Sequence, residues 1–350
     1  KNLKKLLWLV RLRLFIVDKE YKKALTYLNA IPLIKMKNRD KVVFLGDGAE
    51  IVVGIIQENF LAGNFSEVIK VWEIYKDLYV NKVGHDPFLN YLIAHSFLKL
   101  KFYDSFSDFY KKIGEIRSKY KRTFPIWVER IKVKNIMDEL RIYKDFSVGD
   151  LKQAKKDIEK FIKNNPRSNR GNLFLARLNF KEGDYKNSIN NFEKYFSNLK
   201  GSISTSQSEL AEIINEYTGS LYELSNIEKF KKMGKAFIND VKKLNRKNKI
   251  LKSSIERISY LILELDFSKD SPDLNLSLEK NIKDFLKNNP KSIYVDRSNY
   301  LLGMTLIRNK NDEEGEKVLR GILAKESAAV MLKELVNSKL TELKISKRTI

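Results

Sequence analysis

The sequence predicts an all-α fold: a right-handed α-solenoid of paired helices. The chain has 350 residues, which favours either several domains or an elongated repeat array over one compact core. It holds 15 Gly and 6 Pro, too few for an all-β protein, which needs turn residues about every eight to twelve positions. Hydrophobic residues make up 43% and charged residues 32%, which is typical of a folded protein.

An octet that occurs twice shows how the predicted helices end. "FIKNNPRS" covers 161–168, and "FLKNNPKS" covers 285–292. The residues before the first copy form an apolar stripe at spacings of three and four: Leu151, Ala154, Ile158, Phe161 and Ile162. Pro cannot continue a helix, and Asn tolerates the left-handed backbone of a helix C-terminus. We therefore predict that each octet ends a helix and is not a binding loop.

A looser unit recurs eight times along the chain. Each unit has a short turn, then an aromatic or apolar residue, then a small or apolar residue three positions later. The turns are expected near Lys19, Gly63, Lys101, Gly149, Gly183, Glu228, Pro272 and Asn311. The units cover approximately 1–41, 42–85, 86–122, 123–167, 168–200, 201–247, 248–291 and 292–325 of a single array over 1–350. About sixteen paired helices follow, with a capping helix over 326–345 that has an apolar face and a polar face.

The best unit resembles the tetratricopeptide repeat. Its matching residues are Leu175 and Ala176 in the first helix, Gly183, Asp184 and Tyr185 in the turn, and Ser188 and Phe192 in the second helix. The preceding unit contributes Ala154 and Pro166 at the family's spacing, whereas Asn179 stands where the family usually has an aromatic residue. The resemblance implies that small residues such as Ala154 are buried where two helices cross.

The net charge of +23 has two interpretations. It either attracts an acidic partner (nucleic acid, an anionic membrane surface or an acidic protein) or reflects the Lys-rich composition of an A+T-rich genome. The absence of Cys excludes disulfides and zinc–thiolate sites. The most apolar stretch, "LLWLVRLRLFIV" at 6–17, is interrupted by Arg11 and Arg13, so we expect no membrane-spanning helix in this sequence. Because the chain begins at Lys1 without Met, we expect a processed or trimmed product.

No motif in the sequence predicts catalysis, a cofactor or a metal. His85 and His95 are the two histidines, and they lack the ligand spacing of a metal site. "FLGDGAE" at 44–50 lacks the Lys-Ser/Thr of a phosphate-binding loop, so we expect Asp47 to be the N-cap of a helix that starts near Ala49. We therefore expect a protein that is not an enzyme.

The resemblance implies that the first helix of each unit lines a groove that binds partners. The positions that carry over are Tyr91, His95, Lys99, Arg170, Arg177 and Lys181, with Phe180 beside them. Cations next to aromatic rings suit acidic or carboxylate-ended segments of other proteins. The alternative is a solvated basic face that binds nothing.

Two functions follow from these features. The first is a non-enzymatic scaffold that holds other proteins together. In general character the chain is similar to the repeat proteins of the spirochaete periplasmic flagellar collar, which implies collar and stator partners and a periplasmic location, with the cytoplasm as the alternative. The second is a basic helical-repeat protein that binds nucleic acid. The groove positions differ between units, which argues against a code of one base per repeat.

Overall fold

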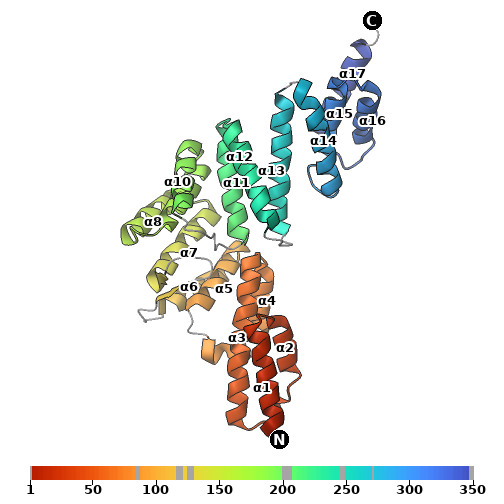
Figure 1. The fold of residues 1–350 in the computed structure, drawn as a ribbon. Helices are drawn as coiled ribbons and strands as arrows, with labels where there is room; N and C mark the ends of the chain where they lie inside the picture. Colours follow the sequence, from red (N-terminus) through yellow and green to blue (C-terminus); the bar gives the residue numbers. More distant parts are fainter. Residues whose placement is uncertain are drawn as a thin grey trace. The chain divides into compact units, whose positions relative to one another are not determined.

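The computed structural model describes residues 2–83, 87–115, 121–123, 130–198, 207–243, 249–269 and 272–346. The chain divides into two compact units, Lys1–Ser220 and Leu221–Ile350, and each is described by itself. The described residues are almost entirely helical, which confirms the predicted all-α repeat fold (Figure 1). A single array over 1–350 stays a prediction.

In its described residues, the first unit consists of helical pairs, one 3₁₀ turn and one short hairpin. Its helices are α1 (Asn2–Val17), α2 (Tyr21–Asn29), α3 (Asn38–Ala62), α4 (Phe65–Val83), α5 (Pro87–Lys99), α6 (Tyr103–Glu115), α7 (Val133–Val148), α8 (Leu151–Asn164), α9 (Arg170–Lys181), α10 (Tyr185–Ser197) and α11 (Gln207–Glu223). The 3₁₀ turn, η1, is Leu33–Lys35. Between α6 and α7, β1 (Lys121–Thr123) pairs antiparallel with β2 (Arg130–Lys132), a hairpin that the sequence did not predict.

The second unit begins in the last turn of α11 and continues with paired helices. These are α12 (Ile227–Lys243), α13 (Lys249–Ser268), α14 (Pro272–Asn288), α15 (Val295–Arg308), α16 (Asp312–Leu323) and α17 (Val330–Ser346). Helix α17 begins four residues after the predicted start of the cap at 326, and its Val336 is fully buried. Helices α15 and α16 approach closely at two glycines, since a Cβ atom on Gly315 would lie 2.7 Å from the carbonyl oxygen of Gly303. A side chain at either position would force this pair apart.

Seven of the turns within the helical pairs share one backbone feature. Among the described residues, those with positive φ angles are Lys19, Gly63, Lys101, Gly149, Gly183, Ser225 and Lys310. The residue after each donates its backbone N–H to the carbonyl five positions earlier, at 2.8–3.0 Å. This is the bond of a Schellman motif, which satisfies the last carbonyls of a helix. Five of these residues are those predicted from the sequence, and Lys310 and Ser225 lie one and three positions from the predicted turn.

Both copies of the octet end a helix, as predicted, and they do so with the same hydrogen bonds. Asn165 follows α8 and donates its side-chain amide to the carbonyl of Phe161 at 2.9 Å, and Asn289 does the same to Phe285 after α14. Asn165 has φ −138°, so the left-handed conformation expected at this Asn is wrong. The side-chain amide satisfies the open carbonyl instead.

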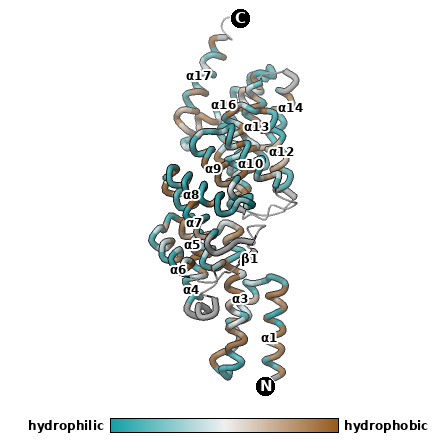
Figure 2. Tube along the Cα trace, turned by 90° about the vertical axis from the view of Figure 1, so that its left-hand side faces the viewer, coloured by the Kyte–Doolittle hydropathy of each residue, from teal (hydrophilic) through white to brown (hydrophobic). Residues whose placement is uncertain are grey.

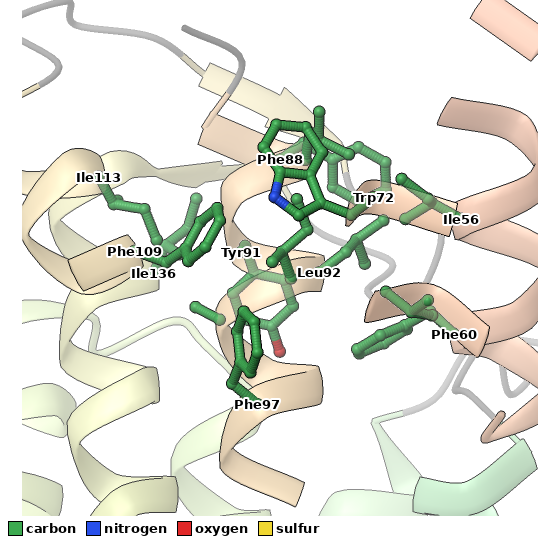
Figure 3. Close-up of a cluster of buried hydrophobic side chains, with 14 of the residues drawn as sticks. Ile56, Phe60, Trp72, Phe88, Tyr91, Leu92, Phe97, Phe109, Ile113 and Ile136 are labelled. Atoms are coloured by element: carbon green, nitrogen blue, oxygen red, sulfur yellow. The ribbon is translucent and has the colours of Figure 1, made fainter. Parts of the chain in front are cut away.

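The first helices of successive pairs stack in the first unit, with contacts from α1 to α3, α3 to α5 and α5 to α7. Ala154 and Ser188 are fully buried at the crossings within their pairs, which matches their expected small-residue role. Helix α5 is at the centre, and every residue from Pro87 to Leu98 is buried. Figure 3 shows its aromatic side chains among those of α3, α4 and α6. A helix that is apolar on all sides is stable only when it is surrounded.

The predicted helix start near Ala49 is wrong. Helix α3 runs unbroken from Asn38 through the Gly-rich segment, because apolar residues on both sides of that segment, including Phe44 and Ile51, are buried in one core. Asp47 therefore lies in the middle of a helix and is not an N-cap. Its carboxylate accepts a hydrogen bond from Nε of Arg13 on α1, at 3.0 Å. Among the described residues, no helix is both long enough and apolar enough to cross a membrane.

Candidate binding pocket on the first helices

Polar side chains from four first helices meet in the first unit, and we refer to them as the polar cluster. Its members on each helix are spaced three, four or seven positions apart, so they share one helix face. They are Tyr91, His95 and Lys99 on α5, Glu139 and Tyr143 on α7, Arg170 and Arg177 on α9, and Glu209, Glu212 and Glu216 on α11.

Arg170 is the buried centre of the polar cluster, with 4% of its surface exposed. Its Nη2 atom lies 3.0 Å from Oε1 of Glu209 and 3.3 Å from Oε2 of Glu139. It also donates to the hydroxyl of Tyr143 at 2.5 Å, and that hydroxyl donates to Glu209. Three helices are therefore held together by one guanidinium group with several donors.

The charges in this network are matched, as buried charges must be. Burial by itself would raise the pKa of Glu209, but Arg170 and Arg177 lower that pKa to about 2. Burial lowers the pKa of Arg170, but the neighbouring carboxylates raise it by more, so this pKa is raised overall. Both groups are therefore ionised at neutral pH.

Arg177 lies one step further along α9 and is 3% exposed. Its guanidinium is 3.2 Å from Glu212 and 3.2 Å from Glu216. Glu212 also accepts a hydrogen bond from Nζ of Lys99 at 2.5 Å. Glu212 thus links α5 to α9 across the surface formed by the first helices.

His95 is buried and neutral. Burial, followed by the positive charge of Lys99, lowers its pKa well below the usual range. Its Nδ1 is 2.8 Å from the hydroxyl of Tyr91, and its ring lies 4.6 Å from that of Tyr143. Its Nε2 has no hydrogen-bond partner in the part of the chain that the structure describes. In the described ranges, no group of three His, Asp or Glu is placed to hold a metal ion.

A pocket of about 320 Å³ opens beside the polar cluster. It is lined by His95, Leu98, Lys99, Lys101, Tyr143, Phe146, Ser147, Arg177, Lys181, Glu212 and Glu216. Lys101 and Lys181 are exposed, and Nζ of Lys181 lies 5.9 Å from the centre of the Phe146 ring. The pocket therefore combines aromatic walls with four cations and two carboxylates, and two of the cations face solvent.

The structure brings most of the predicted groove residues together. His95, Lys99, Arg177 and Lys181 line the pocket, while Tyr91 and Arg170 are buried in the polar cluster. Phe180 packs against the ring of Tyr185 instead, and His85 lies outside the described residues. Contact between these residues and a partner stays a prediction.

The structure changes the role of the two arginines. The sequence suggested that they project from the groove, but carboxylates of the same chain neutralise both. The sequence alone did not single out five members of the polar cluster: Glu139, Tyr143, Glu209, Glu212 and Glu216. Their spacings of three and four on α7 and α11 are the available signal, because they place these residues on the same face as the aligned positions of α5 and α9.

The first helices of successive pairs stack on one another and line the pocket. This arrangement of paired helices defines a tetratricopeptide-like helical-repeat fold. No protein-family model and no curated protein matches this sequence. One similar solved structure is the apo form of the quorum sensor NprR from B. thuringiensis, with 15% identity, a TM-score of 0.48, and 90% of this chain and 85% of that chain covered. Another is the human IFIT1 dimer with m7Gppp-AAAA, with 13% identity, a TM-score of 0.41, and coverage of 88% and 69%.

Proposed function

We propose that this protein is a non-enzymatic scaffold whose pocket binds an acidic segment of another protein. The observation that carries the proposal is the pair of exposed lysines, Lys101 and Lys181, at the rim of a pocket with aromatic walls. Lys99 and Arg177 already contact Glu212 of the same chain. An incoming carboxylate would therefore contact the two rim lysines, while its apolar neighbours pack against Tyr143 and Phe146.

The pocket favours a peptide over nucleic acid. Glu212 and Glu216 interrupt the cations of the lining, so the pocket offers two exposed lysines and not the continuous row of cations that a chain of phosphates requires. A groove that binds single-stranded nucleic acid instead combines cations along the backbone with successive stacking rings. A pocket of about 320 Å³ is at the small end of ligand sites and suits a few side chains.

A role in the spirochaete flagellar collar, with stator proteins as partners and a periplasmic location, is a narrower form of this proposal. This narrower proposal rests on the general character of the sequence, and it names the assembly whose proteins the pocket would bind.

Fluorescence anisotropy with two labelled probes tests the proposal. One probe is a short Glu-rich peptide, and the other is a single-stranded oligonucleotide of equal charge. We expect the peptide to bind with an affinity that falls as salt rises, since exposed charges are screened. Tighter binding of the oligonucleotide at physiological salt, with a steep dependence on salt, would contradict the proposal and favour nucleic acid.

A further inference from the structure

Helix α1 is apolar on two opposite sides. On one side Leu12 and Ile16 are buried, and Trp8, Leu9 and Phe15 pack against the core. On the other side six apolar residues are exposed: Leu3, Leu6, Leu7, Val10, Leu14 and Val17. Their spacings of three and four make one continuous stripe, and Figure 2 shows the hydrophobic colouring along α1. A helix that is apolar all round is normally covered on both sides, so this stripe indicates a surface that docks.

At the N-terminal end of α1, exposed apolar side chains continue onto the neighbouring elements. The ion pair of Lys5 with Asp40 ties the start of α1 to the start of α3. A groove of about 230 Å³ lies between them, with Leu6 and Val43 on its walls. The neighbouring 3₁₀ turn presents Ile34, which is 94% exposed. One end of the first helical pair therefore presents several apolar side chains to solvent.

The surroundings of this surface are strongly basic. Residues 1–41 contain twelve Lys and Arg but three Asp and Glu, so this short segment holds a large share of the net charge of +23. Lys4, Lys35 and Lys37 are exposed beside the apolar residues. The side chains of Lys4 and Arg11 lie over the rings of Trp8 and Tyr27, at 5.3 Å in each case. Long cations along the border of an apolar stripe are typical of helices that lie in a lipid headgroup region.

We propose that the outer face of α1, together with Ile34, docks on an anionic membrane surface. In this arrangement the exposed Leu, Val and Ile side chains enter the headgroup boundary, and the lysines at its edge contact anionic headgroups. A second copy of the chain fits this face less well, because α1 contains no acidic residue and two copies of it would repel each other. This surface lies apart from the pocket residues, so the proposal does not depend on the proposed function.

Co-sedimentation with vesicles tests the proposal. We expect the protein to bind vesicles of phosphatidylcholine mixed with phosphatidylglycerol much more tightly than vesicles of phosphatidylcholine alone. The double variant L7S/I34S keeps every charge and removes two exposed apolar side chains. It should bind the anionic vesicles at least about tenfold more weakly, since the apolar surface buried by two such side chains accounts for that factor. The matched control I74S/V148S removes exposed apolar residues elsewhere in the first unit and should bind like the parent.

Three results would overturn the proposal. In the first, the parent protein fails to bind anionic vesicles. If the parent is also a dimer that the L7S/I34S substitutions convert to a monomer, a second copy of the chain, and not a membrane, covers the stripe. The L7S/I34S variant could bind as tightly as the parent, which would assign binding to diffuse charge. Finally, both double variants could weaken binding equally. Circular dichroism of each variant confirms that the comparison is made between folded proteins.

Discussion

Lys99 and Glu212 are 113 positions apart in the sequence, and the Nζ and Oε1 atoms that join them lie 2.5 Å apart. This ion pair connects α5 to α11, the first helices of the third and sixth repeats, and Arg177 on α9 contacts the same carboxylate. The first helices therefore meet through charge as well as through apolar packing, next to the pocket.

Replacing Glu212 with Gln should weaken this connection. Because Lys99 and Glu212 are both partly exposed, we expect the free energy of unfolding to fall by about 1 kcal/mol. Chemical denaturation of E212Q measures the change. Glu182→Gln alters an exposed residue at the end of α9 and should have no effect. A double-mutant cycle with Lys99→Met should show coupling between the two residues, and strict additivity would contradict the assigned pair.

Replacing Arg170 with Met should be far more damaging. It removes the guanidinium that pairs with the buried carboxylates of Glu139 and Glu209, a change that costs about 3–5 kcal/mol. Thermal unfolding of R170M measures this loss, with Arg167→Met as the exposed control. A loss no larger than that of R167M would contradict the network. For the same reason, reversing Arg170, Arg177 and Lys181 together would unfold the protein and cannot test partner binding.

Replacing Ala154 with Leu should overpack the crossing of α7 and α8. Ala154 is fully buried, so the added atoms must displace its neighbours at a cost of about 1–3 kcal/mol. The neighbouring Lys155 is exposed, and K155L should leave stability nearly unchanged. Equal stability of A154L and K155L in urea denaturation would show that the assigned repeat register is wrong.

Asp145 makes stability depend on pH. Burial, followed by the nearby charge of Asp157, raises its pKa to about 6, with smaller effects of Lys144 and Asp150. Between the unfolded pKa of about 4 and the folded value, the unfolded chain releases this proton while the folded protein keeps it, so stability falls as pH rises. D145N cannot titrate and should be about 1–3 kcal/mol more stable than the parent at pH 7, with no gain near pH 4. Denaturation across this pH range measures the difference, with the exposed Asp104→Asn as control. An unchanged slope in D145N would contradict the assignment.

The turns were predictable because they depend on local chemistry. Gly63, Gly149 and Gly183 favour positive φ angles by themselves, and the duplicated octet showed where two helices end. The polar cluster was less predictable, because its charges are matched between helices far apart in the sequence. Nothing near Arg170 in the sequence shows that Glu209 faces it, so the arginine looked free. The prediction for Asp47 was wrong because its Gly-rich neighbours suggested a break in the helix, whereas burial of the flanking apolar residues keeps α3 continuous.

The most direct test of the central claim is the binding of the labelled Glu-rich peptide to K101E/K181E. This variant reverses the two exposed rim lysines and leaves the buried network intact. The control K156E/K160E reverses two exposed lysines on α8, so both variants have the same net charge. Binding through the pocket predicts that K101E/K181E loses at least about tenfold in affinity while the control stays close to the parent. Equal losses in the two variants would show that diffuse charge, and not the pocket, captures the peptide.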